Sequence, residues 1–202
     1  MKRIATITIL ICILSLQGFG QGITDKNMTF FGVDFSIAKM VGAEGFKDPA
    51  VVKSTFAVWN SLFKVEADKY DLKRPFKKDK VDIDFTNVDK HNEAVSTSGL
   101  VTNGDYSVTP AQVEAVVKSY DTQGKTGLGC VFVVESFDKV KVQGNIYVVL
   151  FDMASKKIYV NEKMEEKPGG FGLKAYWGRT ILGAIDDSGS EFPKWVKGKF
   201  KK

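Results

Sequence analysis

The chain has 202 residues, a formal net charge of +5, 44% apolar residues and 26% charged residues. This composition is typical of one globular domain and excludes collagen, coiled-coil and multi-span membrane proteins. Two cysteines and one histidine also exclude a disulfide framework and a metal site built from several histidines.

The first twenty residues have the layout of a signal peptide. Two basic residues precede an apolar run over residues 4–16, which is too short to span a bilayer, and small residues then fit a cleavage site. We expect residues 1–20 to be removed, leaving Gln21 as the first residue of a soluble periplasmic or secreted protein. Ile11 precedes Cys12 where a lipoprotein signal needs a small residue, so we expect no lipid anchor.

The first half of the mature chain predicts a strand, a helix and a second strand. Residues 28–35 are rich in β-forming residues. Asp48 is an N-cap followed by proline at the first helical position, which indicates a helix ending at about Tyr70. Its inward stripe has helical spacing and contains Val52, Phe56, Trp59 and Phe63. Residues 81–85 alternate, as in a strand with one face in water.

The middle of the chain predicts a loop, a short helix and a buried strand. Residues 91–107 are polar and rich in turn formers, so we expect His91 in an exposed loop. Thr109 and Gln112 form a capping box that begins a helix reaching Tyr120. Residues 130–137 are apolar on both faces, as in a central strand, so we expect Cys130 to be buried and structural.

The last part of the chain predicts two more strands, over 142–152 and 157–164, and a helix over 173–186. The resulting order is β-α-β-α-β-β-β-α, which indicates an α/β (α+β) fold with one mixed β-sheet and helices packed on it. We therefore expect a single domain over residues 21–188, followed by a basic, aromatic tail over 189–202. Such a tail can contact an anionic membrane surface.

The glycine-rich segment between the last strand and the last helix is the strongest candidate site. Gly169, Gly170 and Gly172 must reverse the chain, and at least one of them requires φ > 0. A helix N-terminus with Lys174 in its first turn can bind an anion. Trp177 lies on the same helix and is the fifth tentative ligand-binding residue.

No other constellation predicts chemistry. Asp82 and Asp84 share one side of a strand, where paired carboxylates could hold a cation, but alternation alone explains both residues. A nucleophilic pair of Cys130 and His91 would need an exposed thiol. We therefore predict no catalytic residue, no metal site and no cofactor.

Three segments of the second half carry a resemblance to known proteins. They are residues 129–137 (GCVFVVESF), 147–157 (YVVLFDMASKK) and 168–178 (PGGFGLKAYWG). In these segments the chain resembles a group of small exported proteins from Bacteroidetes that have no assigned activity. Its topology is also similar to envelope lipoproteins of the curli-secretion and penicillin-binding-protein-activator kind, although it lacks their lipid-anchoring cysteine. The resemblance implies a Gram-negative periplasmic or secreted location and supplies no catalytic residue.

Together these features predict a non-enzymatic exported protein that binds another envelope component through its sheet edge or a helix face. The alternative is a periplasmic carrier of a small apolar or anionic ligand, held near Trp59, Trp177 and the loop over 169–172. Nucleic acid is not an expected partner, because an exported protein does not meet it.

Overall fold

Seven strands form one mixed sheet within residues 22–198, the part of the chain that this computed structural model describes. The expected signal peptide therefore lies outside the described residues. Strand β1 (Asn27–Asp34) lies between β3 (Lys80–Ile83) and β5 (Leu128–Asp138) and is parallel to both.

The sheet continues as an antiparallel meander from β5 through β6 (Gln143–Asp152) to β7 (Ile158–Glu166). Two short parallel strands, β2 (Lys39–Val41) and β4 (Val101–Thr102), extend it beside the end of β5. The α/β class and the single mixed sheet predicted from the sequence are confirmed.

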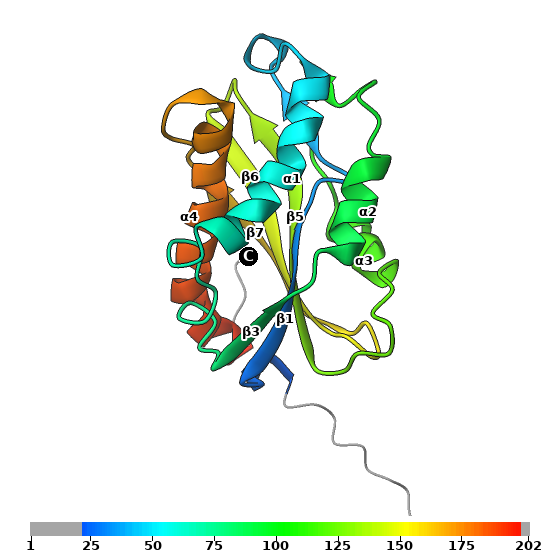
Figure 1. Cartoon of the computed structure of the whole chain (residues 1–202), viewed down its shortest axis with the longest axis vertical. Helices are drawn as coiled ribbons and strands as arrows, with labels where there is room; N and C mark the ends of the chain where they lie inside the picture. The colour runs from blue at the N-terminus through cyan, green and yellow to red at the C-terminus, as the bar shows by residue number, and fades with distance from the viewer. Residues whose placement is uncertain (1–21, 199–202) are drawn as a thin grey trace, which may run out of the picture.

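In the same described residues, four α-helices pack on this sheet, with two short 3-10 turns at Gly22–Thr24 and Ala43–Gly45. Helices α1 (Pro49–Val65) and α4 (Gly172–Trp195) lie side by side over one face (Figure 1), and their apolar residues share one core with that face. The opposite face is covered by α3 (Pro110–Lys118), and α2 (Thr86–Ala94) packs along β1.

Stacked aromatic rings fill the space between α1, α4 and the sheet. Phe56 is 1% exposed and Trp59 is 0% exposed, which confirms the predicted inward stripe of the first helix. The Phe56 ring stacks on Phe35 with centroids 4.2 Å apart, and the Trp177 ring stacks on Phe137 at 4.8 Å. The Trp59 indole donates to the Lys174 carbonyl at 3.0 Å, which joins α1 to the start of α4.

Two buried asparagines complete the hydrogen bonding of β1 where its neighbour β3 ends. The Asn60 side chain accepts from the Val33 N–H at 2.7 Å and donates to the Val33 carbonyl at 2.9 Å. The Asn92 side chain accepts from the Phe35 N–H at 2.7 Å and also donates to the Val33 carbonyl at 3.0 Å. Since unpaired backbone groups are costly when buried, these amides substitute for the missing strand.

The structure corrects two sequence predictions in the first half of the chain. The first helix ends at Val65 rather than at about Tyr70. His91 lies on a helix, over residues 86–94, where a polar loop was predicted. This helix lacks an apolar stripe because Asn87 and Asn92 supply most of its buried face, through hydrogen bonds to backbone groups.

A third correction concerns the predicted tail over residues 189–202. Helix α4 continues to Trp195, so residues 189–195 belong to the folded domain, whereas residues 199–202 lie outside the described part. Phe192 and Trp195 are 3% and 2% exposed and continue the helical spacing of buried residues past Gly189. The prediction was wrong because Gly189 and Pro193 are ordinary signals for the end of a helix.

Candidate functional site

The structure divides the five predicted ligand-binding residues between two places. Gly169, Gly170 and Lys174 line a cavity of about 520 Å³ between α1 and α4. Gly172 and Trp177 line a separate depression of about 210 Å³, where the Trp177 side chain is 1% exposed and belongs to the core. The backbone role is confirmed, because Gly170 has φ of 100° and Gly172 has φ of 77°.

The cavity beside Lys174 has little free positive charge. Lys69 pairs with Glu66 at 3.1 Å, and Arg179 pairs with Asp186 at 3.7 Å. These carboxylates neutralise the two other cations that line the cavity. An anion there would depend on Lys174 and the start of α4, which is a weak arrangement.

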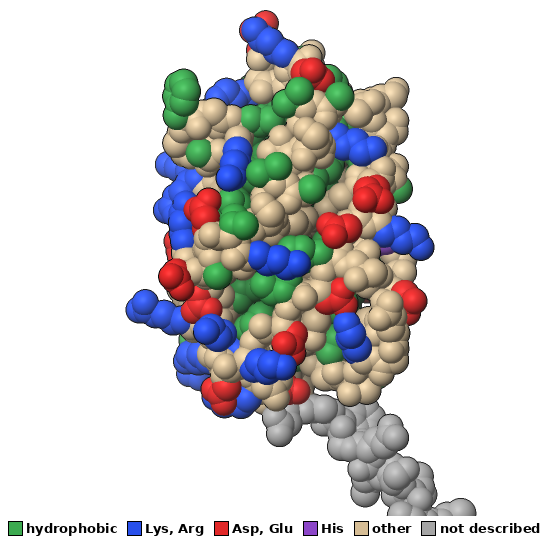
Figure 2. All heavy atoms as spheres, in the orientation of Figure 1, with side chains coloured by type: hydrophobic (Ala, Val, Ile, Leu, Met, Phe, Trp, Pro, Cys, Tyr) green, Lys and Arg blue, Asp and Glu red, His purple; other side chains and the backbone are tan. Residues whose placement is uncertain are grey.

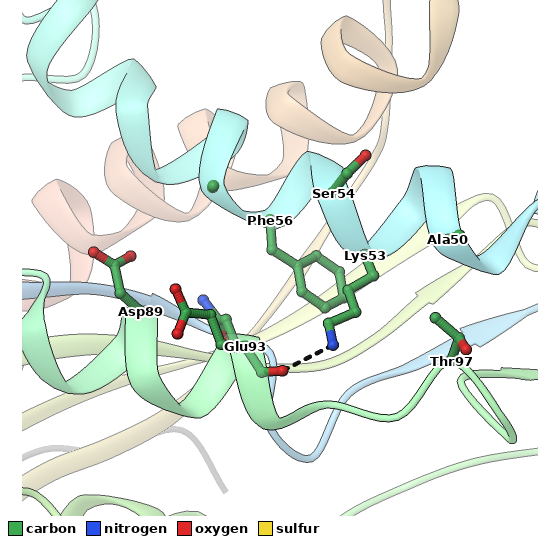
Figure 3. A pocket seen from close by; sticks show the side chains of 9 residues that line it. Ala50, Lys53, Ser54, Phe56, Asp89, Glu93 and Thr97 are labelled. Carbon is green, nitrogen blue, oxygen red and sulfur yellow. Dashed lines mark hydrogen bonds between the residues drawn. The ribbon is translucent and has the colours of Figure 1, made fainter.

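On the other side of α1, a groove of about 470 Å³ separates this helix from α2. Figure 3 shows Asp89 and Glu93 projecting from α2 toward α1, and Lys53 of α1 reaching the Glu93 carbonyl, to which it donates at 2.8 Å. The Phe56 ring lies beneath the groove. The lining is mainly apolar, and acidic side chains stand along one margin.

Two lysines of α1 lie near the carboxylates of this margin without pairing with them, because Lys53 lines the same groove and Lys64 acts on Asp89. Asp89 and Glu93 are one helical turn apart, and neither forms an ion pair among the residues that the structure describes. Partial burial and the neighbouring Glu93 raise the pKa of the Asp89 carboxyl, and the positive charge of Lys64 offsets this only in part. A cation from outside would relieve this repulsion.

The outer face of α1, between the two cavities, carries no charge. It is formed by Ala50, Val51, Ser54, Ala57, Val58, Ser61 and Val65. Its serine hydroxyls donate to carbonyls of the same helix, at 2.8 Å for Ser54 and 2.7 Å for Ser61. The three valines lie seven residues apart and are 52%, 38% and 69% exposed.

Figure 2 shows hydrophobic side chains along the middle of this surface, where α1 crosses it. Both charged residues of α1, Lys53 and Lys64, lie on the flank that faces α2. Exposed surface helices ordinarily carry charges on their outer side, so a charge-free stripe four turns long is typical of a helix that packs on both sides.

His91 belongs to a partly buried polar cluster that the sequence did not predict. Its Nδ1 lies 2.8 Å from Asp34 Oδ2, and the Tyr120 hydroxyl donates to the same oxygen at 2.7 Å. His91 Nε2 lies 3.3 Å from Ser119 Oγ. Burial and the Asp34 carboxylate raise the pKa of Tyr120 well above its usual value.

This series of Asp34, His91 and Ser119 has the order of a hydrolase triad, but its hydroxyl is otherwise engaged. Ser119 Oγ donates to the Val116 carbonyl at 2.6 Å, a closer contact than the one with His91. The contacts join α2 and the end of α3 to the 0% exposed Asp34 of β1. We therefore assign the cluster an architectural role.

The remaining candidates from the sequence are accounted for by local contacts. Cys130 is fully buried in the core under α1 and α4, and burial raises its pKa, which confirms the structural interpretation. Cys130 belongs to a different core from Tyr120, the residue whose ring packs against His91, so the thiol and the imidazole do not form a pair.

The two carboxylates of the predicted strand each have an ion-pair partner. Asp82 pairs with Lys80 at 2.8 Å, and Asp84 pairs with Lys125. Within residues 22–198 no cluster of acidic, histidine and cysteine side chains could hold a metal ion.

Comparison with known proteins returns neither a matching family model nor a curated protein of significant similarity. No helix in the described range is both long and apolar enough to cross a membrane.

Proposed function

We propose that this chain is an exported, non-enzymatic binding module that docks one helix of a partner protein against α1. The observation that carries the proposal is the uncharged outer face of α1, with Val51, Val58 and Val65 exposed at seven-residue intervals. This interval is the repeat with which two helices pack at a shallow angle, so the spacing favours a helix rather than a strand.

The charges beside the face define the chemistry of that helix. Asp89 and Glu93 flank the groove on the α2 side and form no ion pair among the described residues, although Lys53 and Lys64 of α1 lie nearby. On the α4 side Lys174 lines the other cavity. The complementary partner is an amphipathic helix with an apolar stripe, with lysine or arginine on the edge that meets α2.

Cross-linking tests the docking face directly. A photoreactive phenylalanine analogue at Val58 should give one discrete adduct in the organism that makes this protein. The same analogue at Val140, which is 73% exposed on the β5–β6 turn, is the matched control and should give none. The cross-linked peptide should be an amphipathic segment with a basic edge, and adding Asp89→Asn and Glu93→Gln should reduce the yield several-fold.

Three results would overturn the docking proposal. They are equal labelling from both positions, a lipid adduct at Val58, and an adduct at Val58 that contains only a second copy of this chain. Light scattering of the purified protein identifies the last case independently, because a dimer would double the mass.

Export is the other half of the proposal, and the intact mass of the protein in its own host tests it. We expect the mass of the chain beginning at Gln21, because residues 1–20 follow the charge, apolar and small-residue order of a signal peptide. A mass that includes residues 1–20, or one that includes an acyl group on Cys12, would contradict export as a soluble protein.

A further inference from the structure

A cavity of about 400 Å³ lies where the end of α4 meets two segments that are distant in sequence. Phe192 and Pro193 of α4, with Val196 directly after the helix, form its apolar wall. Four lysines from three segments complete most of the lining: Lys26, Lys77, Lys78 and Lys197. No aspartate or glutamate is among the lining residues, so the cavity combines an apolar wall with a lining whose charged groups are all positive.

Lys78 is the unusual member of this group because its side chain is buried, at 6% exposure. Its ammonium donates to two backbone carbonyls, that of Ile23 at 2.8 Å and that of Asp25 at 2.6 Å. It also lies 4.9 Å from the centroid of the Phe192 ring. No carboxylate of residues 22–198 lies within ion-pair distance of it.

A buried ammonium without an ion-pair partner is energetically costly, and burial lowers the pKa of Lys78 to about 8 even though the Asp25 carboxylate acts in the opposite direction. The exposed Lys26, Lys77 and Lys197 add to the positive potential and form no ion pair within the described residues. An anion in the cavity would pair with this ammonium, and an apolar extension of the anion would cover the Phe192 wall.

We propose that this cavity binds an amphiphilic anion, a carboxylate or phosphate group attached to an alkyl chain. The head group contacts Lys78, and the chain lies along Phe192, Pro193 and Val196. The volume falls within the range of ordinary small-ligand sites. This site is separate from the outer face of α1 and does not depend on the docking proposal.

Calorimetry with dodecanoate, below its critical micelle concentration, is the direct test. Dodecanoate should bind at least tenfold more tightly than inorganic phosphate, which lacks the chain, and than dodecyl maltoside, which lacks the charge. Lys78→Met keeps the length of the side chain and removes the charge, so it should weaken dodecanoate binding at least tenfold.

A second variant tests the same cavity without changing the buried Lys78, whose replacement could disturb folding. Lys26→Gln with Lys77→Gln removes two exposed charges from the rim, so it should fold normally and still weaken binding several-fold. Lys47→Gln with Lys90→Gln is the matched control, because it removes the same charge from exposed positions outside the cavity. That control should bind as wild type does.

The pH dependence gives a further readout. Dodecanoate stays ionised above pH 7, whereas Lys78 loses its proton near pH 8 in the free protein, so affinity should fall between about pH 8 and 10. Asp25 and, to a smaller extent, Cys130 raise the pKa of this lysine against the effect of burial, and Lys26 lowers it further by the smallest amount. In Lys78→Met the fall over this range should disappear.

Vesicles distinguish the two sources of such an anion. Co-sedimentation with phosphatidylglycerol vesicles, but not with phosphatidylcholine vesicles, together with its loss in Lys78→Met, would support a membrane lipid as the source. Binding of dodecanoate without co-sedimentation would support a free amphiphile. Equal affinity for dodecanoate and dodecyl maltoside, or dodecanoate binding unchanged in both lysine variants, would overturn the proposal.

Discussion

Replacement of Trp59 by alanine should lower the free energy of unfolding by about 3–5 kcal/mol, the usual cost of deleting a large buried aromatic side chain. Trp59 is 0% exposed, and the centroid of its ring lies 5.2 Å from that of Phe137 and 5.4 Å from that of Phe35. Its indole N–H also donates a hydrogen bond to the Lys174 carbonyl. Because the site is enclosed by other rings rather than flexible chains, we expect the cavity to collapse only partly.

Urea unfolding followed by circular dichroism measures this loss, and Val58→Ala on the same helix is the matched control. Val58 is 38% exposed on the outer face, so its truncation should change stability by less than about 0.5 kcal/mol. Similar losses in the two variants would contradict the assignment of a buried inner face and an exposed outer face to α1.

The elements that the sequence predicted well are those in which apolar spacing and capping residues agree. Asp48 accepts from the Ala50 and Val51 N–H groups at the start of α1, as an N-cap should. Thr109 and Gln112 form the expected reciprocal capping box of α3. In both helices the local signal and the buried stripe indicate the same start, so the prediction needed no tertiary information.

Helix α2 could not be found in the same way, because its inward residues are polar. Asn87 and Asn92 are 8% and 6% exposed, and each amide donates one hydrogen bond to, and accepts one from, backbone groups of Asp121, Val33 and Phe35. Such contacts depend on segments up to 59 residues away in the chain. Apolar periodicity therefore predicts a loop for this segment and an exposed side chain for His91.

The candidate sites show the same limit. The seven-residue spacing of Val51, Val58 and Val65 is visible in the sequence, but only the positions of α2 and α4 reveal that this face of α1 is left uncovered. The lysine cavity has no local signal, because residues 26, 77–78 and 192–197 meet only in the fold. Its wall was also hidden by the incorrect assignment of residues 189–195 to a tail.

Replacement of Gly32 by alanine should be among the most damaging single changes in β1, with a loss of about 3 kcal/mol or more. Gly32 has φ of 104°, in the region that side chains disfavour, and a backbone outlier of this kind costs about 1–3 kcal/mol in a residue with a β-carbon. It lies at the register shift between β1 and β5, where the strand bends.

Strain is only part of this cost, since a β-carbon at Gly32 would collide with three neighbours. It would lie 2.6 Å from Asn60 Oδ1, 2.8 Å from Val88 Cγ2 and 2.9 Å from Phe85 Cδ1. Asn60 Oδ1 is the acceptor for the buried Val33 N–H, so its displacement would leave that donor unpaired, at a cost of about 1–3 kcal/mol.

Gly124→Ala separates the two contributions in the same unfolding experiment. Gly124 has φ of 71°, and a β-carbon there would have no neighbouring atom within 4 Å, so alanine should cost only the strain, about 1 kcal/mol. Asn60→Ala should also lose stability by itself, and its combination with Gly32→Ala should cost less than the two losses added, because the collision with Asn60 is then absent. Equal losses at Gly32 and Gly124 would mean that the Asn60 side chain can move away from the new β-carbon at little cost. Other contacts would then hold the end of β1.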